Sequence, residues 1–211
     1  MNALPVVLCA AAVAGLLWAE RRNSLPGVWL AKPVASAAFV WAAVSAGALA
    51  SSYGRLVLLA LVLCMAGDLL LIPYQLKAAF RAGVLLFLAG HVAFAAAFAG
   101  RPLAVEGLWV GGALLAGVVW TVWKWLGAAV PIDLAIAVRA YLVVIAIMAT
   151  LACAVTAAGG PLAVAAGALA FTASDISVAR DRFVRRDFVN RAWGLPLYYA
   201  AQLLLASTVA A

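Results

Sequence analysis

Charged residues are scarce in this sequence. Asp, Glu, Lys and Arg occupy 10% of its 211 positions, against about 25% in soluble globular domains. The apolar fraction is 69% and the mean hydropathy is +1.17. This composition excludes a soluble domain and indicates an integral membrane protein. The formal net charge of +7 does not indicate a nucleic-acid partner, because the basic residues lie between apolar runs, where topology and anionic membrane lipids account for them.

Cysteine is scarce as well, and its spacing argues against two kinds of site. Cys9, Cys64 and Cys153 lie far apart within apolar runs and form no C-x-x-C pair, so we expect buried thiols rather than disulfides or a zinc site. A G-x-S-x-G motif is missing, and Ser174 has no evident histidine base, which disfavours serine hydrolase chemistry.

Long apolar runs are what the sequence has in abundance. Eight of them lie between clusters of charge, Gly and Pro, and each has roughly 20 residues, enough to cross a bilayer core as a helix. The first basic residue is Arg21, so the charged start of a signal peptide is missing. We therefore expect the first run to be retained as a membrane span.

Helices are the expected form of these runs. Hydrocarbon offers no partners to backbone N–H and C=O groups, and the runs do not alternate as barrel strands do. The sequence predicts one all-α integral membrane domain over residues 1–211. Its eight transmembrane helices are expected at residues 3–19, 30–50, 55–72, 82–99, 107–126, 133–155, 161–179 and 195–210.

Basic residues are concentrated in the loops after the first, third, fifth and seventh spans. Only Arg55 and Arg101 lie in the loops on the other side. Because cytoplasmic loops carry the excess of Lys and Arg, we expect both termini to be non-cytoplasmic. If the cell is bacterial, we expect the protein in its inner membrane. The residues of the basic loops are Arg21, Arg22, Lys77, Arg81, Lys124, Arg180, Arg182, Arg185, Arg186 and Arg191.

A few ionisable residues lie inside the spans instead. They are the acids Asp68 and Asp175 and the bases Lys32, His91 and Arg139. A charge at the bilayer centre costs at least about 2.5 to 3.5 kcal/mol, so each is a functional candidate that should face the bundle interior. With the termini outside, His91 lies near mid-span, and the other four lie near the cytoplasmic ends of their spans.

Structural interpretations of the same residues remain open. Either aspartate can form an ion pair that only stabilises the bundle. Lys32 can extend its side chain to the membrane interface, and His91 can form a hydrogen bond between helices. Four further polar side chains fit packing between helices as well as substrate binding. These are Tyr141, Tyr198, Tyr199 and Gln202.

The intramembrane residues recur at a fixed separation. Arg139 follows Lys32 by 139 − 32 = 107 positions, and Asp175 follows Asp68 by the same number. Tyr198 follows His91 by 107 positions as well. This pattern predicts two parallel four-helix repeats related by an axis along the membrane normal, which would bring the aspartates to equivalent positions around a shared cavity.

Several ordered sequence blocks carry a family resemblance. They are GDLLL at 67–71, FRAGVLLFLAGHVAFAAAF at 80–98, GALAFTASDISVARDRF at 167–183 and YYAAQLLLA at 198–206, with KP at 32–33. Together they resemble the YhhN-like lysoplasmalogenase family over nearly the whole chain. Phe94 stands where that family leads us to expect a tyrosine.

The resemblance implies hydrolysis of the vinyl ether bond of lysoplasmalogens, with Asp68 and Asp175 as the essential aspartates. One carboxyl would protonate the alkene and a second carboxylate would stabilise the oxocarbenium ion or activate water, as in glycosidases. Either aspartate can be the acid, and we take Asp175. This chemistry requires no metal and no organic cofactor. The partners expected are a lysophospholipid substrate and membrane lipids.

Binding roles follow from depth and chemistry. Lys32 and Arg139 are the candidates for the substrate phosphate, and His91 or Tyr199 for holding the water or orienting a carboxylate. The main alternative function is a small lipid or solute transporter or a lipid-binding scaffold, which would also have intramembrane charges and a repeat. Confinement of the ionisable groups to one half of the membrane disfavours alternating access.

Overall fold

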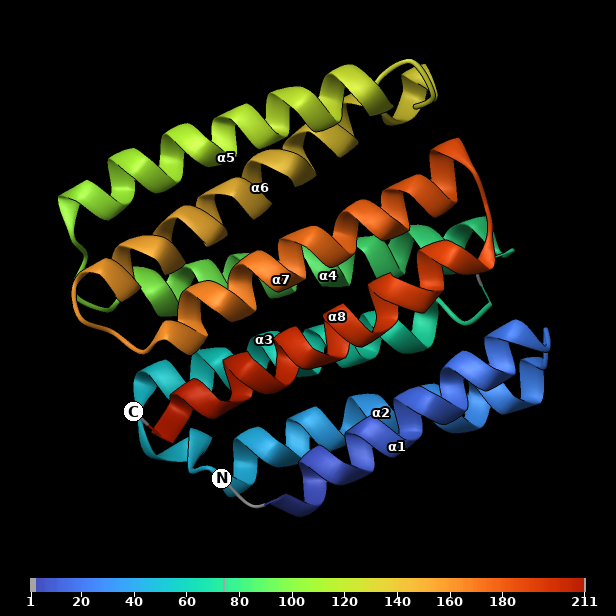
Figure 1. The fold of residues 1–211 in the computed structure, drawn as a ribbon, viewed down its shortest axis with the longest axis horizontal. Coiled ribbons are helices and arrows are strands. Elements are labelled where there is room, and N and C mark those ends of the chain that lie inside the picture. Colours follow the sequence, from blue (N-terminus) through green and yellow to red (C-terminus); the bar gives the residue numbers. More distant parts are fainter. Residues whose placement is uncertain (1–2, 74, 211) are drawn as a thin grey trace.

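The computed structural model describes residues 3–73 and 75–210, apart from the side chain of Asp133. In this part of the chain the regular structure is helical (Figure 1). The α-helices are α1 (Ala3–Arg21), α2 (Leu25–Ser45), α3 (Ser52–Leu70), α4 (Lys77–Ala99), α5 (Val105–Leu126), α6 (Ile132–Ala157), α7 (Leu162–Ala179) and α8 (Phe188–Ser207). Short helical turns follow α2, α7 and α8 at η1 (Ala48–Ala50), η2 (Arg180–Val184) and η3 (Thr208–Ala210).

The eight α-helices confirm the predicted all-α class. Helices α1 to α7 are long and apolar enough to cross a membrane, which makes the chain an integral multipass membrane protein. Helix α8 is less apolar because it carries Asn190, Arg191 and Gln202. Figure 1 shows α8 running along the length of the bundle beside α7, and both Asn190 and Gln202 are buried.

Helices α2 and α8 begin earlier than predicted, because polar caps start them within the charged segments. The side chain of Ser24 accepts a hydrogen bond from the backbone N–H of Gly27, so α2 starts at residue 25 rather than 30. The side chain of Asp187 accepts from the backbone N–H of Asn190, so α8 starts at residue 188 rather than 195.

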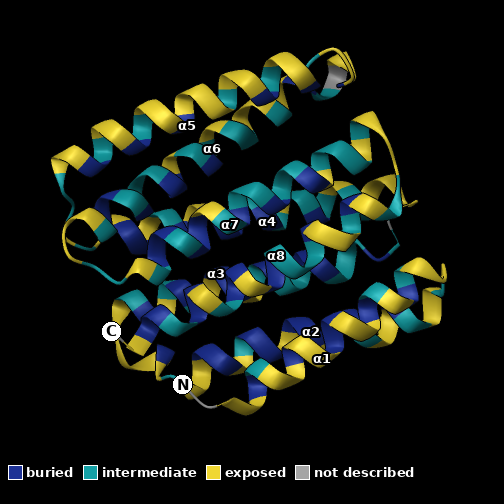
Figure 2. Cartoon of the chain, viewed as in Figure 1, coloured by how far each residue is buried: buried dark blue, intermediate teal, exposed yellow. Residues whose placement is uncertain are grey.

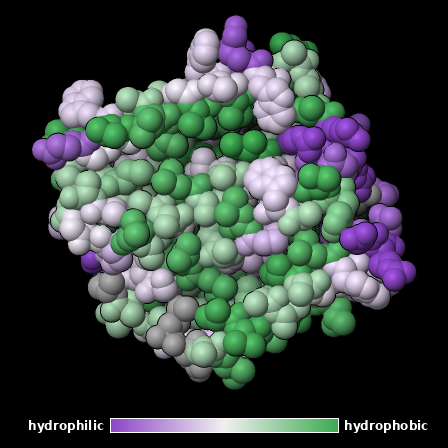
Figure 3. Space-filling model, in the orientation of Figure 1, coloured by the Kyte–Doolittle hydropathy of each residue, from purple (hydrophilic) through white to green (hydrophobic). Residues whose placement is uncertain are grey.

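Successive helices run in opposite directions. The hairpins α1–α2 and α5–α6 lie at the two edges of the bundle, and α3, α4, α7 and α8 lie between them (Figure 1). The start of α1 and the end of α8 lie at one end. The turns with most basic residues lie at the other, where hydrophilic atoms gather at the right of Figure 3. Which end faces the cytoplasm stays a prediction from the positive charge.

Helix α5 is the least buried of the bundle and lies at its periphery (Figure 2). It packs along α6, where Gly107 allows close approach because a Cβ there would lie 2.6 Å from Ala154 Cα. Its other faces expose large side chains such as Trp109 and Leu114. The α5–α6 hairpin is therefore joined to the rest of the bundle mainly through α6.

Close helix contact positions two of the predicted site residues. A Cβ at Gly90 would lie 2.8 Å from Cys64 Sγ, and one at Gly67 would meet α4 at a similar distance. Small residues let helix backbones approach closely in membranes, where dispersion contacts drive association. The neighbours of these glycines in the sequence are His91 and Asp68, so this packing fixes where both polar side chains enter the bundle.

Gly90→Leu is expected to lower the thermal stability of the detergent-solubilised protein, because the new side chain overlaps α3. Overpacking of this kind costs about 1–3 kcal/mol. Gly117→Leu is the matched control, since Gly117 is an exposed glycine of α5 with open space around its Cα. Equal melting temperatures for the two variants would contradict the close α3–α4 contact.

Candidate functional site

Both intramembrane aspartates line one cavity inside the bundle. Its volume is about 1020 Å³. The polar side chains that line it include Asp68 from α3, Asp175 from α7, Lys32 from α2, Tyr141 from α6 and Tyr198 from α8. Five helices thus contribute to one polar site.

Asp68 is surrounded by hydrogen-bond donors. Lys32 Nζ lies 3.3 Å from its Oδ1, and the hydroxyls of Ser36 and Tyr198 donate to its Oδ2 at 2.8 and 2.7 Å. Tyr199 lies behind Ser36 with its hydroxyl 3.2 Å from Ser36 Oγ. Because Ser36 donates to Asp68, Tyr199 is the donor to Ser36. An ammonium group and two hydroxyls favour the ionised carboxylate at Asp68.

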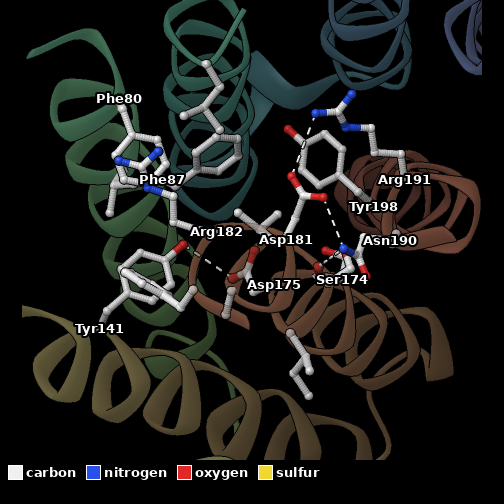
Figure 4. Close-up of a pocket in the computed structure, with 18 of the residues that line it drawn as sticks. Phe80, Phe87, Tyr141, Ser174, Asp175, Asp181, Arg182, Asn190, Arg191 and Tyr198 are labelled. Carbon is white, nitrogen blue, oxygen red and sulfur yellow. Dashed lines mark hydrogen bonds and ion pairs between the residues drawn. The ribbon is translucent and has the colours of Figure 1, made fainter. Parts of the chain in front are cut away.

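Asp175 has a different set of partners. Its Oδ2 lies 3.0 Å from His91 Nε2 and accepts a hydrogen bond from the Tyr141 hydroxyl at 3.3 Å. Tyr141 and Asp175 point toward each other across the cavity (Figure 4). The side chain of Asp175 is 15% exposed, against 3% for Asp68, so Asp175 is the more accessible carboxyl.

The backbone contact of His91 determines how protons are shared with Asp175. His91 Nδ1 lies 2.8 Å from the carbonyl oxygen of Phe87, which only accepts, so Nδ1 carries a hydrogen. Nε2 then either accepts a hydrogen bond from a neutral Asp175 carboxyl or, in an imidazolium, donates a hydrogen bond to the carboxylate. The contact between His91 and Asp175 therefore has the geometry for passing one proton between the two groups.

Packed aromatic rings connect the two carboxyl groups. The Phe171 ring lies 4.2 Å from the His91 ring and 5.6 Å from the Tyr198 ring, measured between centroids. His91 reaches Asp175 and Tyr198 reaches Asp68. The two polar clusters are therefore held in fixed relation by the rings between them.

Arg139 lies away from the two aspartates. Its guanidinium stacks over the Trp123 ring at 4.3 Å and lines a separate cavity between α5 and α6. Tyr199 and Gln202 are buried in the bundle core but do not line the cavity of the aspartates. Lys32, His91, Tyr141 and Tyr198 are the predicted binding residues that the structure brings to Asp68 or Asp175.

Sequence reasoning missed Ser36, which donates to Asp68. It lies four residues after Lys32 and therefore on the same helix face, and this spacing was the available signal. The charged residues at the basic end were interpreted as topological only. Several of them also line the mouth of the cavity: Glu20, Lys77, Arg81, Asp181, Arg182, Arg185, Arg186 and Arg191.

An apolar arm of the cavity runs between α5 and α7. It is lined along α5 from Leu126 to Leu115, which is about 16 Å of helix for eleven residues. Val118 on α5 and Val178 on α7 line the arm and are also exposed on the outside. Figure 3 shows this face hollowed between the two helices, with apolar atoms around the hollow.

The described residues contain no group of three or more His, Cys, Asp or Glu side chains placed to hold a metal ion. The expectation that the chemistry needs no metal and no organic cofactor stays a prediction. The donors present around Asp68 and Asp175 are ammonium, hydroxyl and imidazole groups, which hold and move protons.

A multi-span helical bundle with carboxyl groups in an internal cavity defines a membrane protein whose polar chemistry lies inside the bundle. The chain belongs to the YhhN family, whose family model matches residues 27–209. The resemblance inferred from the sequence blocks is thereby confirmed, and membership is consistent with a hydrolase built into the membrane. No solved structure matches the chain.

Lys32→Met is expected to destabilise the protein, because it leaves the buried Asp68 carboxylate without its cation. Breaking a buried ion pair from one side costs about 3–5 kcal/mol. The double variant Lys32→Met, Asp68→Asn should recover most of that loss, since no buried charge is left unpaired. Thermal melting in detergent measures both effects, and a double variant no more stable than Lys32→Met would contradict the pairing.

Proposed function

We propose that this protein is a membrane-embedded lysoplasmalogenase. It hydrolyses the vinyl ether bond of a lysophospholipid to a fatty aldehyde and a glycerophosphocholine or glycerophosphoethanolamine head group. The observation that carries the proposal is the pair of carboxyls that line one cavity, each with a different set of partners. Membership of the YhhN family and the multi-span fold support it.

The reaction requires one acid, one anion and one water. Proton transfer to the outer alkene carbon breaks the double bond and leaves an oxocarbenium ion on the carbon next to the ether oxygen. Water adds to that carbon, returns a proton to the base and gives a hemiacetal. The hemiacetal then loses the glycerol oxygen as a hydroxyl group and becomes the aldehyde, so the sum is substrate plus one water.

Asp175 fits the role of the acid. Its pairing with His91 supplies one transferable proton, and it is the more accessible of the two carboxyls. Tyr141 orients the same oxygen that meets His91. After the first step the Asp175 carboxylate is placed to take the proton from the attacking water, as the acid residue of a retaining glycosidase does.

Asp68 fits the role of the anion. Lys32, Ser36 and Tyr198 favour its ionised form, which stabilises a positive charge that develops in the cavity. A carboxylate held by fixed donors needs little reorganisation when the oxocarbenium ion forms. The two aspartates thus differ in partners in the way that acid and electrostatic stabiliser must differ.

The shape of the cavity suits a single-chain lipid. Its apolar arm between α5 and α7 accommodates the hydrocarbon tail, and its charged mouth faces the polar head group. Among the described residues its lining includes none from the loops at the opposite end of the bundle. A cavity lined at one of the two bundle ends supports an enzyme over a transporter, which needs access from both faces of the membrane.

Asp175→Asn is expected to abolish aldehyde release from a lysoplasmalogen, because an amide cannot supply the proton. Asp68→Asn is expected to do the same, because the stabilising negative charge is lost. Aldehyde formation by purified protein in detergent measures both effects. Loss of about 10³-fold or more in kcat is expected, as for other essential acid and electrostatic groups.

Two controls accompany these variants. Glu106→Gln removes an exposed carboxyl from the first turn of α5, far from the cavity lining, and should retain normal activity. The double variant Lys32→Met, Asp68→Asn avoids the unpaired lysine of Asp68→Asn and should be folded but inactive. Near-normal activity in Asp175→Asn or in the folded double variant would rule out the two-aspartate mechanism.

His91→Gln is expected to lower kcat about 100-fold, the lower end of the range for proton-transfer groups, with KM changed less than twofold. The reason is that His91 holds the proton of Asp175 and makes no contact with the tail arm. The dependence of kcat on pH should change as well, since the acid no longer shares its proton with an imidazole. An unchanged kcat with an unchanged pH profile would contradict the proton-transfer role of His91 and would indicate that it only packs between helices.

A further inference from the structure

The charged mouth of the cavity contains arginines in two different situations. Arg191 forms ion pairs with Glu20 and Asp181, and Arg185 pairs with Asp187. Arg182 and Arg81 also line the mouth, and among the described residues neither lies within ion-pair distance of a carboxylate. Their positive charge is therefore not neutralised by a described acidic side chain.

Arg182 is held over the cavity by an aromatic ring. Its guanidinium lies 4.0 Å from the centre of the Phe80 ring, so the Arg182 side chain extends from η2 to α4 (Figure 4). Stacking engages the face of a guanidinium and leaves the N–H groups on its edges available to a ligand. Arg81 follows Phe80 in the sequence and is exposed beside the same mouth.

Arg182 lies close in the sequence to the proposed acid. It follows Asp175 by seven residues, and both residues line the same cavity. The π-helical turn η2 (Arg180–Val184) carries Arg182 where α7 ends, and such turns are frequent at functional sites. Helix α4 begins at the same mouth without a side-chain cap, so the positive end of its dipole adds to the potential there.

We propose that Arg182 and Arg81 bind the phosphodiester group of the lysophospholipid. The inference rests on the proposed function and assigns the residues that bind the phosphodiester of its substrate. Asp175 and Arg182 line the same cavity, so a lipid bound there can present its vinyl ether to one and its phosphate to the other. The role expected from sequence for Arg139 passes to these two arginines, because Arg139 lies outside the cavity.

The test compares two substrates that differ only in the head group. One is an alkenyl glycerophosphoethanolamine, and the other is the corresponding alkenylglycerol, which has no phosphate. Arg182→Gln and Arg81→Gln should each raise KM for the phosphodiester about tenfold, the effect of one charge-assisted hydrogen bond. KM and kcat for the alkenylglycerol should stay within twofold of wild type.

Arg22→Gln is the matched control. Arg22 is exposed at the same end of the bundle and does not line the cavity, so this variant removes the same charge without touching the site. Its KM for both substrates should equal that of wild type. An equal loss on both substrates in Arg182→Gln and Arg81→Gln, or the same KM change in Arg22→Gln, would overturn the phosphate site.

A binding experiment separates failure of this site from failure of the proposed reaction. Saturated alkyl glycerophosphoethanolamine and alkylglycerol are not hydrolysed, and their binding is measured by tryptophan fluorescence. Wild type should bind the phosphodiester lipid about tenfold more tightly than alkylglycerol, and Arg182→Gln should remove that preference. If this preference is present but no aldehyde forms, the reaction is refuted and the site stands. If wild type shows no preference, the site is refuted.

Discussion

The cost of an unpaired charge inside a membrane bundle governs how these helices meet. Asp68 lies on α3 and has partners on α2 and α8. Asp175 lies on α7 and has partners on α4 and α6. The contacts of each carboxyl thus link three helices, and the two carboxyls together link six of the eight α-helices. Helices α1 and α5 contribute to neither cluster and lie in the edge hairpins. The two acids are therefore paired only when these six helices are assembled.

The fold class and the polar residues were predictable because both depend on local composition. Asp68 and Asp175 stand out in apolar runs, whatever the helices pack against. Partners were not predictable, because the contact of His91 with Asp175 joins helices far apart in the sequence. Arg139 resembles Lys32 in sequence but lies outside the cavity, because the α5–α6 hairpin presents it to Trp123. Ser36 escaped notice because serine is common in membrane helices.

The partner pattern bears on the predicted repeat. Asp68 meets Tyr198 and Asp175 meets His91, and Tyr198 follows His91 by 107 positions, as Asp175 follows Asp68. Each acid therefore meets the ring from the other half of the chain, which is the exchange that a two-fold relation would produce. Helix α5 departs from the pattern, since α1 packs against both α2 and α8 whereas α5 packs mainly against α6. The repeat itself stays a prediction.

The loose attachment of α5 has a consequence for turnover. The proposed reaction makes two products of opposite solubility from one lipid, and the cavity has an apolar arm at α5 and a charged mouth at the basic end. A fatty aldehyde can leave sideways into the bilayer while the water-soluble glycerophosphodiester leaves through the mouth. Neither product then has to pass the other. The aldehyde leaves through the apolar arm at α5, which is then empty for the tail of the next lipid.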